Sequence, residues 1–127
     1  MKQLQLMEKY PLNARTIAKT DTTLKNTDEV IAFIKAKIDA HPVATFIANF
    51  DHYTHTKSLE NGEINPDFTD AQNIIFCFGV QLPKAEMLGI RPRSIGAVET
   101  EENFIVSFMD APNAQAQQFM IEWVEAI

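Results

Sequence analysis

Apolar residues recur with helical spacing most clearly between Asn26 and His41. Val30, Ile34 and Ile38 form one ridge, with charged residues on the remaining surface. Asn26 or Thr27 can act as the N-cap residue, and the proline that follows His41 disfavours helical backbone before it. The pattern therefore predicts an amphipathic helix across this stretch.

Two further stretches have similar spacing. Residues 2–10 carry apolar side chains near helical intervals, which predicts a short amphipathic helix ended by Pro11. A longer apolar stripe begins after Asp110–Asn113 and continues to Ile127. A proline at the start of this stripe suits the first turn of a helix.

Five stretches are rich in β-branched and aromatic residues and predict strands. They are residues 14–20, about 43–51, 73–79, 94–100 and 103–109. Only Glu101–Glu102 and their polar neighbours separate the last two, which predicts an antiparallel hairpin. The run 73–79 is apolar throughout, so we expect a central strand covered on both faces. A turn-rich loop is expected at 58–70 and a helical turn at 84–88.

The predicted order is strand, helix, four strands, helix. Helices do not separate the strands one by one, as a parallel doubly wound sheet requires. The sequence therefore predicts one α+β domain over residues 1–127. Its sheet would be mostly antiparallel, with four to five strands and the two main helices packed on one face.

Charge and cysteine content narrow the class of protein. Eleven Lys and Arg against 17 Asp and Glu give a net charge of −6, and no basic stripe offsets it, so we expect no nucleic-acid partner. No apolar run approaches the roughly 20 residues of a membrane helix, and the first residues do not resemble a signal peptide. One cysteine, Cys77, fits a reducing compartment. A cytoplasmic protein is the expectation.

The strand at about 43–51 organises the candidate chemistry, because titratable side chains follow it directly. If the backbone stays extended, Asp51, His52 and His55 emerge together at a sheet margin. A turn near His52 would instead let these three supply a mixed oxygen and nitrogen metal site, with Glu60 or Glu63 completing it. The simpler alternative is a hydrogen-bonded His52 and a solvated His55.

Two arginines form a second candidate. Arg91 and Arg93 flank a proline, and in an extended segment both guanidinium groups project to one side, where they could clamp a carboxylate or phosphate. Ion pairs with surface carboxylates are the alternative. Cys77 lies in an apolar run with no adjacent base, so a nucleophilic role is not favoured.

Several short motifs together resemble the small bacterial family called domain of unknown function 302. They are, in order, Ala-Thr-Phe-Ile-Ala-Asn-Phe-Asp-His (44–52), Ile-Ile-Phe-Cys-Phe-Gly (74–79), Met87-Leu88, Ile-Arg-Pro-Arg-Ser-Ile (90–95) and the closing hairpin. The resemblance implies an α+β sandwich that is often a homodimer. It implies no established activity, and it draws attention to Asp51 and His52.

The sequence thus supports more than one function. The first hypothesis is a non-enzymatic homodimer that binds a small ligand, which could be an anion, through His52, His55, Arg91 and Arg93. The alternative is a metal-dependent protein or enzyme that uses Asp51, His52 and His55. A purely structural interaction module is a third. Neither the identity of the ligand nor that of any cofactor follows from the residues.

Overall fold

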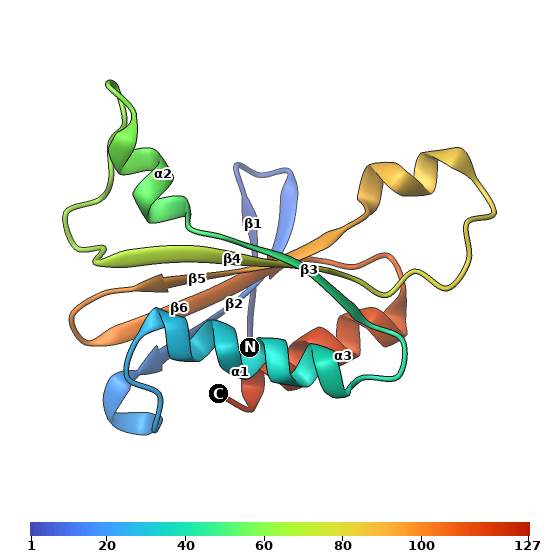
Figure 1. The fold of residues 1–127 in the computed structure, drawn as a ribbon, viewed down its shortest axis with the longest axis horizontal. Coiled ribbons are helices and arrows are strands. Elements are labelled where there is room, and N and C mark those ends of the chain that lie inside the picture. Colours follow the sequence, from blue (N-terminus) through green and yellow to red (C-terminus); the bar gives the residue numbers. More distant parts are fainter.

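The computed structural model of the protein describes residues 1–127. Its elements are β1 (Lys2–Leu6), β2 (Tyr10–Ala18), a 3₁₀ turn (Lys19–Asp21), α1 (Thr27–Ala40), β3 (Thr45–Phe50), α2 (His52–Ser58), β4 (Asp70–Cys77), a second 3₁₀ turn (Ala85–Ile90), β5 (Arg93–Glu99), β6 (Asn103–Met109) and α3 (Ala114–Glu125). All six strands form one antiparallel sheet in the order β1-β2-β6-β5-β4-β3 (Figure 1). The predicted α+β class is confirmed, with one strand more than expected.

Helices α1 and α3 pack on one face of this sheet, below the strands in Figure 1. Their apolar stripes meet alternate residues of β2, β4, β5 and β6, because successive strand residues point to opposite faces. The buried cluster is Ile17, Val30, Ile31, Ile34, Ile38, Ile74, Phe76, Ile95, Ala97, Phe104, Val106, Phe108, Met120, Trp123 and Val124. The predicted ridge of α1 is therefore part of the core, and the side chain of Asn26 caps this helix by accepting a hydrogen bond from the Glu29 N–H at 2.9 Å.

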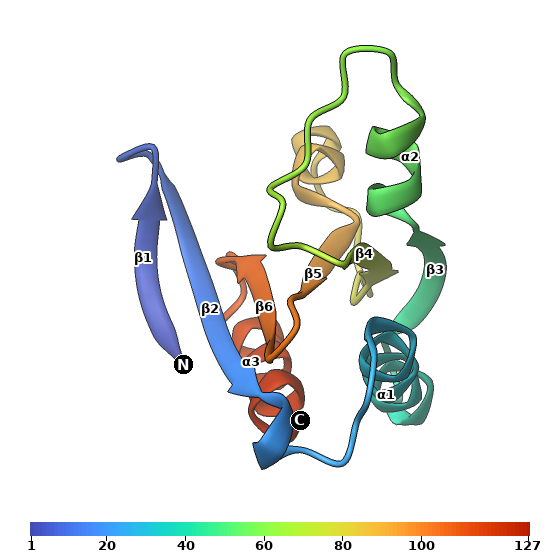
Figure 2. The same ribbon diagram turned by 90° about the vertical axis from the view of Figure 1, so that its left-hand side faces the viewer.

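The opposite face of the sheet is only partly covered. Helix α2 and residues 59–69 lie against it at one end, away from α1 and α3 in Figure 2. Strand β4 lies next to the edge strand β3, and its residues alternate between buried and half-buried. The expectation that this strand is covered on both faces was therefore wrong: Asn73, Ile75 and Cys77 are only half-buried on the second face.

The predicted N-terminal helix is also wrong, because residues 2–6 form the edge strand β1. A tight turn joins β1 to β2, with the Lys9 N–H bonded to the Leu6 carbonyl at 3.1 Å. Met7 and Glu8 both have positive φ, at 55° and 60°. Two successive left-handed residues match the right-handed twist of a hairpin, but glycine and asparagine are the usual residues there. The sequence therefore lacks the usual signal of this turn.

The backbone does not stay extended through the histidines. Strand β3 ends at Phe50 and α2 begins at His52, because the Asp51 carboxylate caps the helix. One oxygen accepts the Thr54 N–H at 3.0 Å and the other accepts the Thr54 hydroxyl at 2.7 Å. Aspartate is itself one of the residues favoured at a helix N-cap. The apolar alternation before it had masked that signal.

None of the helices combines the length and the apolar composition needed to cross a bilayer.

Candidate functional site

The two ends of the sheet differ in the charged side chains they carry. We call one end the arginine end, because Arg91 and Arg93 lie there; β4 and α1 finish at this end, and β5 and α3 start at it. We call the other the carboxylate end, because Asp28, Asp70 and Glu99 lie there; β4 and α1 start at this end, and β3 and β5 finish at it. Each end has a cavity, of about 540 Å³ at the arginine end and about 350 Å³ beside α2. Ligand pockets in proteins commonly have volumes of about 300–1,000 Å³.

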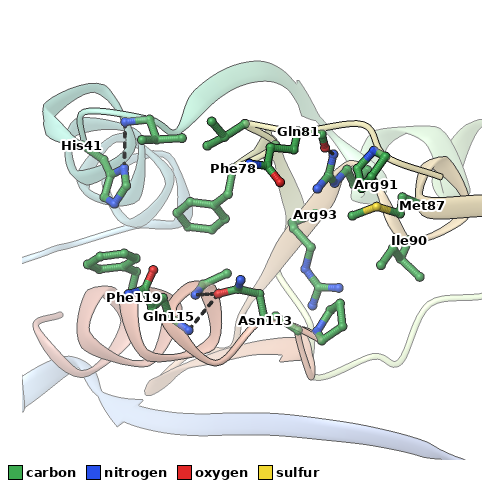
Figure 3. Close-up of a pocket in the computed structure, with 17 residues that line it drawn as sticks. His41, Phe78, Gln81, Met87, Ile90, Arg91, Arg93, Asn113, Gln115 and Phe119 are labelled. Carbon is green, nitrogen blue, oxygen red and sulfur yellow. Dashed lines mark hydrogen bonds between the residues drawn. The ribbon is translucent and has the colours of Figure 1, made fainter. Parts of the chain in front are cut away.

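Arg93 is the first residue of β5 and lies in the middle of the larger cavity (Figure 3). Its guanidinium donates a hydrogen bond to the Met109 carbonyl, and its Nε atom is buried without a partner. Burial lowers the pKa of Arg93, and the nearby charge of Asp110 partly offsets this. An arginine stays protonated despite such a shift, so a desolvated positive charge stands at this position.

Arg91 reaches the same cavity from the segment before β5. Its Nη1 atom donates to the Gln81 carbonyl at 2.7 Å, which folds the side chain back over Gly79. A Cβ atom at Gly79 would lie only 2.8 Å from that Nη1 and 3.2 Å from the Cys77 sulfur. The missing side chain at this glycine therefore lets the guanidinium lie against the backbone after β4.

Aromatic rings form the opposite wall, with Phe78 and Phe119 on the side of the cavity away from Arg91 (Figure 3). Phe78 is stacked with the core residue Trp123 at 5.4 Å between ring centroids, and Phe119 stands edge-on to His41 at 4.4 Å. These contacts anchor the wall to the hydrophobic core. We did not expect these residues at a site, because helical spacing and an apolar run explained them as core.

His41 holds this wall in place through hydrogen bonds to the backbone. Its Nδ1 accepts hydrogen bonds from the N–H groups of Val43 and Ala44, at 3.1 and 3.0 Å. These bonds assign the lone pair to Nδ1 and the proton of the neutral ring to Nε2. The ring therefore fixes the path of the chain from α1 into β3 along the edge of the cavity.

No aspartate or glutamate lines the larger cavity. Asp110, whose charge acts on Arg93, is held outside it by hydrogen bonds from Asn13 at 2.6 Å and Gln117 at 3.2 Å. Two amides in the first turn of α3 are also occupied, since the Asn113 side chain accepts the N–H groups of residues 115 and 116. The positive groups that remain for a ligand are the two arginine side chains.

The histidines predicted to join these arginines lie elsewhere. His52 lines the smaller cavity, together with Glu63, whereas Arg91 and Arg93 line the larger one. His55 lines neither of the two cavities. The four side chains therefore do not form one pocket.

Helix α2 does bring His52 and His55 onto one side, with 6.4 Å between their ring centroids. Both rings pack against Phe50, at 5.3 and 5.4 Å, and Nδ1 of His52 is hydrogen-bonded to the Thr56 hydroxyl at 3.1 Å. Both oxygens of Asp51 are occupied by the helix cap, and hydrogen bonds from the Thr54 backbone and hydroxyl hold the pKa of Asp51 below its usual range. No cluster of three or more His, Cys, Asp or Glu side chains is arranged to hold a metal ion.

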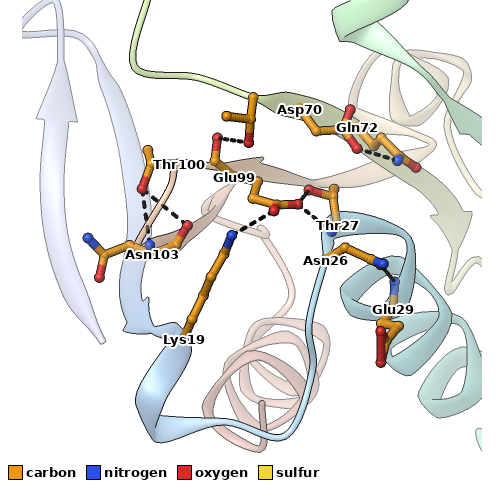
Figure 4. A network of polar contacts seen from close by, with 10 residues as sticks. Lys19, Asn26, Thr27, Glu29, Asp70, Gln72, Glu99, Thr100 and Asn103 are labelled. Atoms are coloured by element: carbon orange, nitrogen blue, oxygen red, sulfur yellow. Dashed lines mark hydrogen bonds and ion pairs between the residues drawn. The ribbon is translucent and has the colours of Figure 1, made fainter.

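Glu99 is the centre of the carboxylate end (Figure 4). It accepts hydrogen bonds from the Lys19 ammonium at 2.7 Å and from the backbone and hydroxyl of Thr27, both at 2.8 Å. Burial by itself raises the pKa of Glu99, but the bonds from Lys19 and Thr27 outweigh it, so the pKa lies below its usual value. Gln72 similarly donates to Asp28 and Asp70, at 2.6 and 2.9 Å. These carboxylates hold α1 and the strands together.

The comparison with known families covers the whole chain. The model of a family of unknown function, DUF6858, matches residues 1–127. The chain belongs to this family. The expectation of an uncharacterised family is thus confirmed, although the family that matches is DUF6858 and not domain of unknown function 302, which the short motifs resemble. No curated protein and no solved structure matches this DUF6858 chain.

Proposed function

We propose that this protein is a binding module for a small anion, with the cavity at the arginine end as its site. One observation carries the proposal: a chain with net charge −6 builds a cavity of about 540 Å³ that contains two arginines and no carboxylate. Acidic side chains outnumber basic ones by 17 to 11 in the whole chain, so the absence of acidic side chains from this lining favours an anionic ligand.

The arginines retain the donors that such a guest needs. A guanidinium carries five N–H donors in a planar fork that matches a carboxylate or phosphate. Arg91 and Arg93 each use one nitrogen on a backbone carbonyl, and these bonds hold both groups in position before a ligand arrives. Such preorganisation favours binding, because less side-chain freedom is lost.

We also propose that the module is a homodimer in the cytoplasm. An apolar patch on the second face of the sheet supports the dimer: the neighbouring strand residues Leu6 and Tyr10, together with Met109, are 51%, 47% and 46% exposed. A second copy could cover it. The unpaired thiol of Cys77 fits a reducing compartment.

The binding proposal is tested by thermal unfolding in the presence of acetate, benzoate or phosphate at constant ionic strength. An anion that binds the folded state raises the midpoint. We expect the shift to disappear in Arg91→Gln, a side chain whose single hydrogen bond is to an exposed loop. Lys84→Gln removes the same charge from the same segment without touching the cavity lining and should keep the shift. Equal shifts in wild type and Arg91→Gln for every anion would refute the proposal.

The dimer is tested separately, by size-exclusion chromatography with light scattering. We expect the mass of two chains for wild type and of one chain for Leu6→Lys/Tyr10→Lys. Leu82→Lys is the control, because Leu82 is 69% exposed but belongs to the segment after β4 and not to β1, β2 or β6. A wild-type mass of one chain at all concentrations would rule out the dimer.

A further inference from the structure

We infer that the anion is a monocarboxylate with a ring-sized apolar body, oriented with its carboxylate toward the arginines and its body toward Phe78 and Phe119. This inference rests on the proposed binding function and names the class of ligand. It follows from the arrangement of apolar and charged groups across the cavity and from the charge balance at its centre.

The apolar part of the cavity is too large for a simple inorganic anion. Phe78 and Phe119 line the side that contains His41, and Met87 and Ile90 lie near the arginines (Figure 3). Val43 also lines the cavity, and its N–H is bonded to His41. Val43 and Ile90 are 42% and 45% exposed in the free protein. A ligand body that covers these surfaces would remove apolar area from water, which acetate or phosphate cannot do.

The position of the charges sets the orientation of the ligand. Arg93 lies between the aromatic wall and the segment that carries Arg91, so both arginines lie on the side of the cavity away from Phe119 (Figure 3). The opposite end offers aromatic rings that are already fixed by stacking on the core. A molecule with an anionic head and an apolar body matches this polarity along its length.

The charge balance favours one negative charge over two. Arg91 and Arg93 supply two positive charges, but the charge of Asp110 acts on Arg93 and offsets part of this. Counted as formal charges, the two arginines together with Asp110 carry a net charge of +1. A carboxylate is then matched by the site, whereas a phosphate dianion would lose more hydration than the site returns.

The test is a titration of the whole protein, by isothermal calorimetry at pH 7 and constant ionic strength, with a matched set of probes. Acetate has the carboxylate without the apolar body, and 3-phenylpropan-1-ol has the apolar body without the charge. The acid 3-phenylpropanoate has both, and phenyl phosphate combines an apolar body with a larger negative charge. We expect 3-phenylpropanoate to bind at least about tenfold more tightly than acetate or the alcohol, and more tightly than phenyl phosphate.

Substitutions in the lining assign the two halves of the ligand. Val43→Asn should weaken binding of 3-phenylpropanoate about threefold, and Phe119→Ser about tenfold, while acetate binding stays unchanged. Val43 is largely exposed, so its substitution keeps the test valid if Phe119→Ser fails to fold. Leu59→Asn replaces a 50% exposed apolar residue outside the cavity lining and should change neither affinity.

The outcomes separate this inference from the binding proposal. If acetate, phosphate and 3-phenylpropanoate bind equally and all depend on Arg91, the module binds anions but the ligand class is wrong. If phenyl phosphate binds most tightly, the monocarboxylate is wrong as well. If the alcohol binds as tightly as the acid, or if no probe depends on Arg91, both proposals fail.

Discussion

The carboxylate end and the arginine end of this sheet use charged residues for different purposes. At the carboxylate end, Glu99 and Asp51 accept several hydrogen bonds each, from Lys19, Thr27 and Thr54, and these bonds join or start secondary-structure elements. At the arginine end, each guanidinium makes one hydrogen bond to a backbone carbonyl and still faces a cavity.

The difference shows how the surroundings of a charged group decide its role. A carboxylate whose lone pairs are filled by its own chain has little left for a ligand, and it contributes to stability. A guanidinium with unused donors in an apolar, carboxylate-free cavity can still gain a partner. Substitutions at the carboxylate end should therefore lower the free energy of unfolding, whereas substitutions at the arginine end should weaken ligand binding.

The largest expected effect is that of Glu99→Ala on the free energy of unfolding. The substitution removes the acceptor of three hydrogen bonds and leaves a Lys19 ammonium that is only 26% exposed without its partner. We expect a loss of about 2–3 kcal/mol, measured by urea denaturation. The same measurement on Arg91→Gln should give a loss below about 0.5 kcal/mol, as is usual for a surface substitution. A larger loss for the arginine variant would reverse the comparison.

The acid side of the stability profile should depend on the same carboxylate. The pKa of Glu99 in the folded protein lies below its ordinary value of 4.5, so the folded state binds this proton less readily than the unfolded state. Its contribution is fully present above about pH 4.5 and is lost as the pH falls through the lowered pKa. Urea midpoints between pH 3 and 7 should therefore fall less steeply on acidification in Glu99→Gln than in wild type. Parallel curves would show that Glu99 is not a source of the acid sensitivity.

Gly79→Ala should affect binding with little effect on folding. The new Cβ would meet the Arg91 guanidinium at 2.8 Å, and the flexible end of that side chain is what can move. We expect a carboxylate ligand such as 3-phenylpropanoate to bind about tenfold more weakly, because one charged hydrogen-bonding group is displaced. Calorimetric titration measures the affinity, and urea denaturation checks that the fold is retained. Unchanged affinity would mean that the position of Arg91 does not matter.

Asp51→Ala should have a small and local effect. Without the cap, the first turn of α2 loses its acceptor, and the amide of Thr54 should exchange with deuterium faster than in wild type. Asp51→Asn keeps a capping side chain and should exchange at a rate close to that of wild type. Carboxylate binding at the opposite end should be the same in both variants. A loss of carboxylate binding in Asp51→Ala would show that the carboxylate end influences binding at the arginine end.

The double substitution His52→Ala/His55→Ala should leave the affinity for a carboxylate unchanged, because neither histidine lines the larger cavity. The same variant tests the alternative function. Metal content is measured by elemental analysis before and after dialysis against a chelator, and we expect no stoichiometric metal in either protein. Retained metal that disappears in the double variant would favour the metal-dependent alternative.

The elements with regular periodicity could be predicted from the sequence. The apolar ridge of Val30, Ile34 and Ile38 correctly predicted α1, and the polar break at Glu101–Glu102 correctly predicted the hairpin of β5 and β6. The fold class followed from the order of these elements. Strand β1 was missed because Met7 and Glu8 adopt a turn that other residues usually form.

The candidate site could be predicted only in part. Arg91 and Arg93 are close in sequence and their types indicate anion binding, so they were found. The aromatic wall of their cavity comes from His41, Phe78 and Phe119, which follow α1, follow β4 and lie in α3, respectively, and become neighbours only on folding. Conversely, Asp51, His52 and His55 are close in the sequence and follow the end of β3, but β3 runs in the same direction as β5, so the end of β3 and the start of β5 at Arg93 lie at opposite ends of the sheet.

The turn at Met7 and Glu8 has a consequence for the outer margin of the sheet. A non-glycine residue pays about 1–2 kcal/mol for left-handed backbone, and this turn contains two in succession. Strand β1 is joined to the rest of the sheet by β2 alone, and most of its side chains are exposed. It should therefore be the first strand to detach under mild denaturant, ahead of global unfolding. An asparagine–glycine pair in place of Met7 and Glu8 would suit this turn and stabilise the pairing of β1 with β2.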